Sequence, residues 1–270
     1  MALRVAITDV MPGPVSLFGP APGADLVPSS VPVATRLAMT DLLLSLGATP
    51  GDAETMAAAA SPVDPGFMTR LLERGADPNG EGGKPLSLAA SSGSKEIVRV
   101  LLAHGADPNL ATDCPSALLW ASLWGHHDII DQLLAAHADP NFGGHVSRAD
   151  ADAAISFASR EQPVAATDYV TTAFAGFVPG SNVPPLVAAA TWDHWDVAAK
   201  LLTAGADPNA RAGSLTPVMA AAAYDHPVTL KLLLDAGAAP TSPDPRVADP
   251  AVIAGQRGAT EVVTLLRTPR

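Results

Sequence analysis

Apolar residues recur along this chain in short blocks rather than in one continuous run. Each block holds an alanine-rich segment, then a polar break, then a second segment that closes on two adjacent leucines. The alanine-rich segment is predicted to be a short helix that packs closely on its neighbours, and the leucines are predicted to bury a second helix. The leucine pairs stand at 71–72, 101–102, 133–134, 201–202 and 233–234.

A five-residue turn follows the leucines. Gly75-Ala76-Asp77-Pro78-Asn79 recurs at 105–109 and 205–209, a copy at 137–141 has His137 in place of the glycine, and a degraded copy occupies 237–240. The copies start 30, 32, 68 and 32 residues apart. Glycine takes the left-handed conformation that ends a helix, and Asp-Pro-Asn cannot continue one. His137 must accept a positive φ, or its helix ends differently.

Capping residues followed by proline mark where helices begin. Thr216-Pro217 and Asp249-Pro250 each place a capping oxygen before a proline at the first helical position. Gly93 and Gly125 are predicted to end the first helices of their blocks. The second helices begin with a carboxylate in the first turn, where the helix dipole favours it; these residues are Glu96, Asp128, Asp196 and Glu261.

Two short helices and an outward turn at a period of about 33 residues resemble the ankyrin repeat. The resemblance covers residues 54–267 and implies an all-α, ankyrin-repeat solenoid of about six helix-turn-helix units with outward finger loops, the last unit being a C-terminal cap. Tetratricopeptide repeats share the period but lack this outward turn. Residues 31–53 are expected to form an N-terminal capping helix and linker, and residues 1–30, rich in Pro and Gly, an extended arm.

One finger loop is much longer than the others. The segment between Asn141 and the next helix cap, 142–183, takes 42 residues, whereas the segments at 110–115 and 210–215 take six. The insertion holds four of the six phenylalanines and Tyr169, and this apolar content predicts that it packs onto the rest of the molecule. Because the fingers of ankyrin arrays overhang the groove lined by the first helices, the resemblance places the insertion there.

The two residues before the polar break differ from block to block while the scaffold stays the same. In ankyrin-repeat proteins these positions line the concave face and contact partners. Here they would place Trp124, Trp192 and Tyr224 at one position in three successive repeats, as interface anchors of a kind that binding sites favour. The alternative is that the rings fill gaps in the core. The predicted partner-binding residues are Trp124, Trp192, Tyr224, Ser92, Arg257, Leu123 and Thr191.

Histidines 126, 194 and 226 also share one position of the repeat. Zinc ligands lie within about 2.0–2.3 Å of one ion, whereas equivalent positions in stacked helices stand about 8–10 Å apart. These histidines are therefore predicted to be structural, with no metal bound. Trp120 stands at a leucine position of the core and is predicted to be structural as well.

No nucleophile, phosphate-loop or dinucleotide motif occurs, so no cofactor is predicted. An enzyme assembled from scattered groups is not favoured but stays open. In that alternative, the insertion closes over the groove to form a pocket for a small molecule. Its candidate residues are Asp193, His194, Asp225 and His226 on the repeats and His145, Asp168 and Tyr169 in the insertion.

Composition and charge restrict the class of partner. With 48% hydrophobic and 16% charged residues, the chain is too apolar to be disordered. A net charge of -11 disfavours nucleic acid and anionic membranes and favours a partner with a basic surface. The lone Cys114 and the lack of a long apolar run fit a cytoplasmic protein. The predicted function is a non-catalytic module that binds a protein or peptide in an aromatic-lined concave groove. A further alternative is a structural scaffold with no specialised groove.

Overall fold

The structure is a computed structural model that describes residues 65–112, 114–144, 182–244 and 247–268. Within these ranges the chain forms α-helices joined by turns and two isolated antiparallel bridges, which confirms the all-α prediction. The predicted arm (1–30), the predicted capping segment (31–53) and most of the insertion lie outside the described residues.

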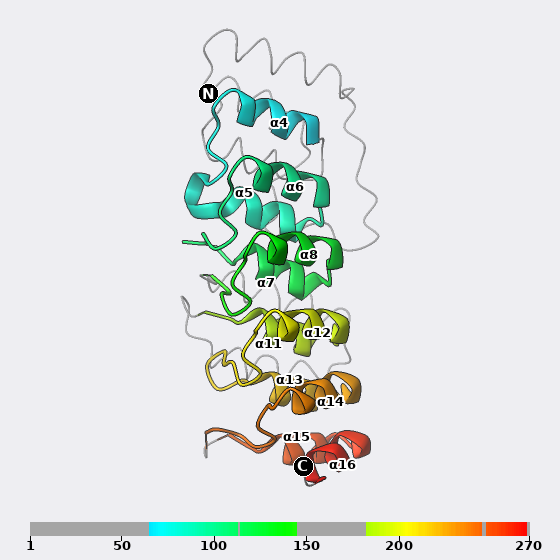
Figure 1. Cartoon of the computed structure of the whole chain (residues 1–270). Coiled ribbons are helices and arrows are strands. Elements are labelled where there is room, and N and C mark those ends of the chain that lie inside the picture. Colours follow the sequence, from blue (N-terminus) through cyan, green and yellow to red (C-terminus); the bar gives the residue numbers. More distant parts are fainter. Residues whose placement is uncertain (1–64, 113, 145–181, 245–246, 269–270) are drawn as a thin grey trace.

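The helices alternate between a first and a second helix of each repeat, and Figure 1 shows the pairs stacked into one elongated array with α4 near one end and α16 at the other. The first helices are α5 (Gly80–Ser91), α7 (Ala117–Trp124), α11 (Pro185–Thr191), α13 (Pro217–Ala223) and α15 (Pro250–Gln256). The second helices are α4 (Pro65–Glu73), α6 (Lys95–Ala103), α8 (His127–Ala135), α12 (Trp195–Thr203), α14 (Pro227–Asp235) and α16 (Thr260–Arg267).

First helices pack on first helices along the whole array. The order of contacts runs α5, α7, α11, α13, α15, so α7 packs directly on α11 although the insertion separates them in sequence. The insertion therefore adds no layer to the stack. The second helices α8 and α12 approach each other less closely than other neighbouring second helices do. Two long side chains span this step, with Lys200 Nζ 2.7 Å from Asp131 Oδ2 and His127 Nε2 3.3 Å from Asp196 Oδ2.

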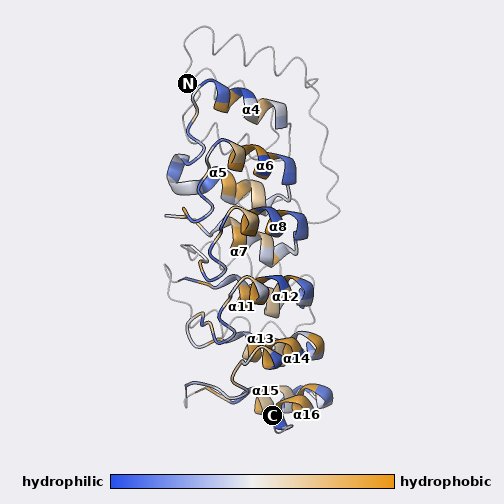
Figure 2. Cartoon of the chain, in the orientation of Figure 1, coloured by the Kyte–Doolittle hydropathy of each residue, from blue (hydrophilic) through white to orange (hydrophobic). Residues whose placement is uncertain are grey.

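The core consists of alanines from the first helices and leucines from the second. Ala189, Ala220, Leu133 and Leu201 are all fully buried, and Figure 2 shows hydrophobic residues concentrated where the helices face one another. Small side chains allow first helices to approach closely, and the leucines fill the space behind them. Trp120 is only 3% exposed and belongs to this core, as predicted.

Left-handed residues end the helices at the predicted places. Gly75, Gly105 and Gly205 have φ between 86° and 94° after the second helices, and His137 adopts φ 63° in the same role, which settles the alternative that the sequence left open. At the ends of the first helices, Gly93 and Gly125 are left-handed, and two aspartates with φ near 56° replace glycine in later repeats. Aspartate is one of the few residues that tolerates this conformation.

The predicted caps are only partly right. Thr216 accepts a hydrogen bond from the backbone N–H of Met219, 3.2 Å away, as expected of an N-cap. Asp249 also stands at an N-cap, but its carboxylate accepts no bond from its own helix. It accepts instead from the backbone N–H of Ser242 at 2.9 Å, because the preceding loop folds back within reach. The predicted first-turn carboxylates of the second helices are all in place.

The asparagines that close the turns join each repeat to the next. Asn141 uses both ends of its amide: Nδ2 donates to the carbonyl of Gly205, and Oδ1 accepts from the N–H of Asp207 at 2.8 Å. The same double contact is made by Asn79, Asn109 and Asn209. This asparagine ladder crosses the insertion without a break, so the repeats on its two sides stack as direct neighbours.

The two ends of the insertion are held side by side. The Asn182 side chain donates to the carbonyl of Asn141 at 3.0 Å and accepts from the N–H of Gly143. The Ser116 backbone N–H donates to the carbonyl of Gly143 at 2.8 Å, which ties this neck to the start of α7. Gly143 permits the closure because a Cβ there would lie 1.8 Å from the Val183 carbonyl oxygen. The insertion thus leaves and re-enters the array at one fixed point.

Candidate partner-binding site

The predicted site positions form one structural row. Ser92, Trp124, Trp192, Tyr224 and Arg257 each stand at the C-terminal end of a first helix, immediately before the residue with positive φ. The helices that carry them are consecutive neighbours in the stack. The three rings therefore follow one another along the array, which is the register that the sequence predicts.

Burial separates these rings from the core tryptophan. Trp124, Trp192 and Tyr224 are half-buried, and Trp124 and Tyr224 pack against the hydrophobic core with part of the ring. Trp120, by comparison, is almost completely buried in the core. Tyr224 also stacks on the imidazole of His226, with ring centroids 5.9 Å apart and an interplanar angle of 19°. Trp124 and Tyr224 are thus braced on one side, and all three rings keep part of their surface exposed.

The remaining predicted contact residues differ from the rings. Ser92 and Leu123 are half-buried, and Arg257 is exposed at the end of the array. Thr191 is buried, and its hydroxyl donates to the carbonyl of Val187 at 2.8 Å. Its place is therefore beneath the surface, where it satisfies its own helix, rather than facing a partner as the sequence suggests.

Two of the three histidines fasten a ring position to the following repeat. His194 Nε2 lies 3.2 Å from the carbonyl oxygen of Leu123, and His226 Nε2 lies 3.2 Å from that of Thr191. These carbonyls immediately precede Trp124 and Trp192 in the chain. The backbone under Trp124 and under Trp192 is thus held by a side chain of the next repeat. These contacts agree with a structural role for His194 and His226. Their link to the aromatic row could not be read from the sequence.

Two of these histidines are driven toward the neutral form. Burial lowers the pKa of His126, and it lowers the pKa of His194 in the same way, because removing an imidazolium from water disfavours its charge. A hydrogen bond to the Ser91 backbone partly opposes the shift at His126, as does the bond to Leu123 at His194. A neutral imidazole with its proton on Nε2 can donate to these carbonyls.

The other pocket candidates also take part in contacts between repeats, or lie on the surface. Asp193 has φ 56°; its Oδ1 accepts from the Thr229 hydroxyl at 2.8 Å, and its Oδ2 lies 3.8 Å from His226 Nδ1. Asp225 has φ 57° and is exposed. His145, Asp168 and Tyr169 lie outside the described residues. In the parts of the chain that the structure describes, no group of three or more His, Cys, Asp or Glu could hold a metal ion.

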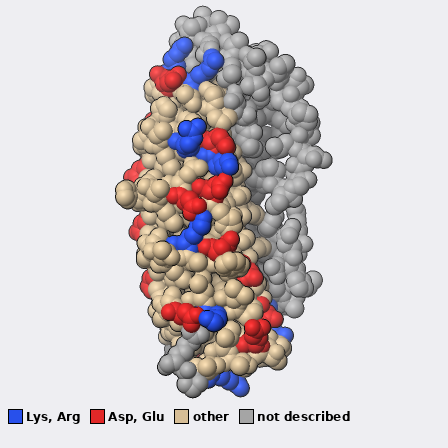
Figure 3. Space-filling model, turned by 45° about the vertical axis from the view of Figure 1, so that its right-hand side comes forward, with Lys and Arg blue, Asp and Glu red and all other residues tan. Residues whose placement is uncertain are grey.

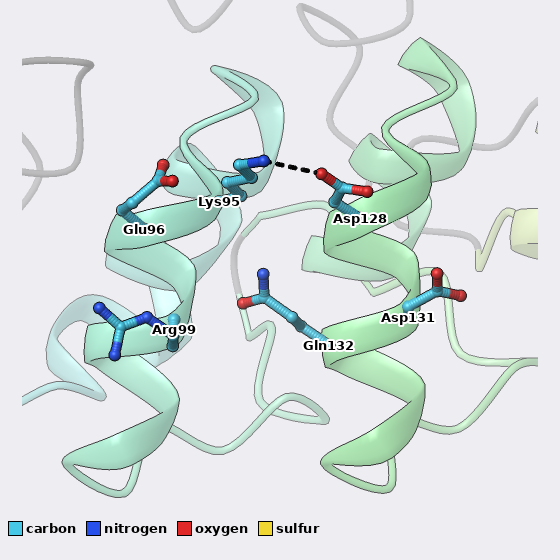
Figure 4. Close-up of a pocket in the computed structure, with 6 residues that line it drawn as sticks. All are labelled: Lys95, Glu96, Arg99, Asp128, Asp131 and Gln132. Atoms are coloured by element: carbon cyan, nitrogen blue, oxygen red, sulfur yellow. Dashed lines mark hydrogen bonds and ion pairs between the residues drawn. The ribbon is translucent and has the colours of Figure 1, made fainter.

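The outer face of the array carries a shallow hollow between α6 and α8. Figure 4 shows its lining, with the Lys95 ammonium pointing to the Asp128 carboxylate across the two helices at 2.9 Å. The hydrogen bond between them lowers the pKa of Asp128 and raises that of Lys95. Exposed pairs of this kind contribute little to stability. The other lining residues are Glu96, Arg99, Asp131 and Gln132.

The charge along the side of the array is mixed in sign. Figure 3 shows acidic and basic side chains interspersed on one face rather than a continuous basic stripe. No helix in the described ranges is long and apolar enough to cross a membrane. Nothing on this face has the clustered positive charge with which proteins track a nucleic-acid backbone.

Comparisons with known proteins agree on the repeat. A family model described as "Ankyrin repeats (3 copies)" matches residues 55–143, and a single "Ankyrin repeat" model matches 183–212 and 214–245, so together they cover more than half of the chain. The chain is 33% identical over 129 residues to a putative ankyrin repeat protein of fowlpox virus, of which it spans 29% of the length; these residues are 47% of this chain. It is also similar to the crystal structure of the human ASB11 ankyrin repeat domain, with a TM-score of 0.64, 23% identity and coverage of 88% of this chain and 96% of that one.

Proposed function

Because this chain belongs to the ankyrin-repeat family, whose arrays generally serve as protein–protein interaction modules, we propose that it is a non-catalytic binding module that holds a protein or peptide partner against its aromatic row. The row consists of Trp124, Trp192 and Tyr224. The partner would lie along the C-terminal ends of α7, α11 and α13, with Ser92 and Arg257 extending the contact to either side.

One observation carries this proposal: three large rings recur at a single position of consecutive repeats and are half-buried there. Large aromatic side chains are enriched at interface centres because they offer much apolar area with few rotatable bonds. The backbones before Trp124 and Trp192 are also fixed by hydrogen bonds from the next repeat. A braced ring loses little conformational freedom on binding, which favours affinity.

The charge supports a partner with a basic surface. A net charge of -11 creates a negative field that attracts cationic proteins over a distance and speeds their encounter. Such steering weakens as salt screens it. We propose that the insertion forms one wall of the site: its neck is fixed at the start of α7, and Trp124 lies at the other end of this helix, about 12 Å along its axis.

The experiment compares capture by two forms of the full chain. Wild-type protein and a Trp124→Ala/Trp192→Ala/Tyr224→Ala variant are used as baits in extracts of the source cells, and bound proteins and metabolites are quantified by mass spectrometry. We expect one or more proteins to be enriched by the wild type and reduced at least about tenfold with the variant, because each anchor contributes about 1 kcal/mol or more. Val252→Ala, at an exposed residue of α15 outside the row, is the control.

Circular dichroism and thermal melting show whether the triple variant keeps its helices. Equal capture by a folded triple variant would refute the aromatic row as the binding surface. Enrichment of a small molecule that depends on the rings, without any protein, would favour an enclosed pocket instead.

A further inference from the structure

Successive second helices are linked by ion pairs that follow one geometric rule. Lys95 Nζ lies 2.9 Å from Asp128 Oδ2, and His127 Nε2 lies 3.3 Å from Asp196 Oδ2. Lys95 and His127 occupy the same position, the first residue of their helices. In both cases this residue meets the second residue of the next second helix. The pair between Asp131 and Lys200 shows the same offset of one position, one turn further along the helices.

The next pair of second helices is α12 and α14. Applied to this pair, the same offset places two exposed apolar residues side by side. Trp195 is the first residue of α12, and Val228 is the second residue of α14, the helix that packs on α12. Trp195 is 51% exposed and Val228 is 57% exposed. At this step an apolar pair therefore stands where the two preceding steps have an ion pair. We call Trp195 and Val228 the edge patch.

Carboxylates surround the edge patch. Asp193 precedes Trp195 by two residues and bonds to Thr229, the neighbour of Val228. Asp225, three residues before Val228, is exposed, and Asp196, which follows Trp195, stays accessible to solvent beside its contact with His127. The nearby lysines are engaged elsewhere: Lys200 pairs with Asp131, and Lys231 pairs with Asp235. The patch is thus an apolar spot in an acidic setting.

We propose that the edge patch is a second binding surface, separate from the aromatic row, for a partner segment in which an apolar side chain is flanked by lysine or arginine. The apolar side chain would contact the Trp195 ring and Val228. The flanking cations would pair with Asp193, Asp196 and Asp225. A cation can also lie over the face of the Trp195 indole, an arrangement that is favourable at exposed sites.

Size and charge argue against a second copy of this chain as the occupant. About half of a tryptophan, whose full area is about 150–250 Å², together with part of a valine is far below the roughly 800 Å² per partner of a stable interface. Two chains with a net charge of -11 also repel each other. A short basic segment needs only one apolar anchor, and its charge is complementary to the carboxylates around the patch.

The test uses a random-peptide library displayed on phage. Peptides are selected on the wild-type chain and counter-selected on a Trp195→Lys/Val228→Asp variant. This double substitution conserves net charge and introduces the same residue types that form the Lys95–Asp128 pair, so the array is expected to fold. We expect patch-dependent peptides to share an apolar residue flanked by lysine or arginine, and to bind the double variant at least about tenfold more weakly than the wild type.

Two further variants separate this surface from the aromatic row. Asp193→Asn keeps a residue that tolerates a positive φ and removes one charge; it should weaken the selected peptides severalfold and reduce the salt dependence of their binding. Trp124→Ala should leave their affinity within about twofold of the wild type, because additivity holds for distant sites. Trp195→Ser serves as the patch variant if the double substitution does not fold.

Each other outcome overturns the proposal. The edge patch is not a basic-segment site if no selected peptide distinguishes the wild type from the folded patch variants, or if the patch-dependent peptides lack basic residues. Peptides that lose affinity with Trp124→Ala but not with the patch variants would support the aromatic row alone.

Discussion

The two ends of each helix pair behave in opposite ways. At the finger end, the asparagine ladder repeats the same double hydrogen bond at four successive turns, even across the insertion. At the other end, where first and second helices meet, the residue at the ring position changes from serine to tryptophan, tyrosine and arginine. Yet the backbone there still passes through a left-handed residue in every repeat.

The difference shows how this chain separates folding from recognition. Contacts that stack repeats are made by backbone groups and by a few side chains that recur unchanged, so they fix the spacing of the array. At Trp124 and Trp192 the backbone is supported by histidines of the next repeat, which bond to the carbonyls of Leu123 and Thr191. A side chain can therefore change at this position without loss of the stack, as expected of a solenoid whose units depend on their neighbours.

Core leucines provide the strongest contrast with the rings. Leu201→Ala removes a fully buried side chain of α12 and should lower the free energy of unfolding by about 2–5 kcal/mol. Trp192→Ala should cost less, because its ring is only partly buried and loses less burial than the leucine. Chemical denaturation monitored by circular dichroism measures both. A ring substitution as costly as the leucine substitution would assign the rings to the core and remove the basis for the binding proposal.

The asparagine ladder offers a smaller test at the step across the insertion. Asn141→Ala breaks the amide contacts to Gly205 and Asp207 and should destabilise the array by about 1–2 kcal/mol, since each hydrogen bond contributes about 1 kcal/mol. At this step α8 and α12 also approach less closely than other second helices. We therefore expect Asn141→Ala to make unfolding less cooperative, with two transitions in denaturant.

The matched control is Asn109→Ala, which breaks the equivalent contacts between repeats that have no insertion between them. It should cost a similar free energy while unfolding stays in one transition. Identical broadening in both variants would contradict the view that the insertion step is the weakest joint of the array.

The sequence predicted the repeat because its signals are local. A left-handed residue after the leucines, a carboxylate in the first turn and a proline at the first helical position each act within one or two turns of chain. His137 took the conformation that its place in the repeat demands. The helix at Asp249-Pro250 begins where predicted, but the Asp249 carboxylate bonds to Ser242, which lies in a loop whose path no periodic signal determines.

Contacts that depend on how one repeat is shifted relative to the next could not be predicted from the sequence. The shared register of Trp124, Trp192 and Tyr224 follows from alignment alone, but the bond from His194 to the Leu123 carbonyl requires the stacking geometry. The same holds for the edge patch. Trp195 and Val228 occupy different positions of the repeat, so aligning the repeats does not bring them together; only the one-position offset seen in the ion pairs does.

Acid should weaken the array through the buried histidines, and this effect is the subtlest of those expected. The pKa values of His126 and His194 lie below the value of about 6.5 expected in the unfolded chain. The unfolded chain then binds more protons over this interval, so the free energy of unfolding falls as pH drops from about 6.5 toward the folded pKa values. His194→Gln keeps an N–H that can donate to the Leu123 carbonyl but does not titrate. Urea unfolding at pH 7.5 and 5.5 should show a smaller loss of stability in the His126→Gln/His194→Gln variant than in the wild type. An unchanged loss would mean that these histidines are not what makes the stacked repeats sensitive to acid.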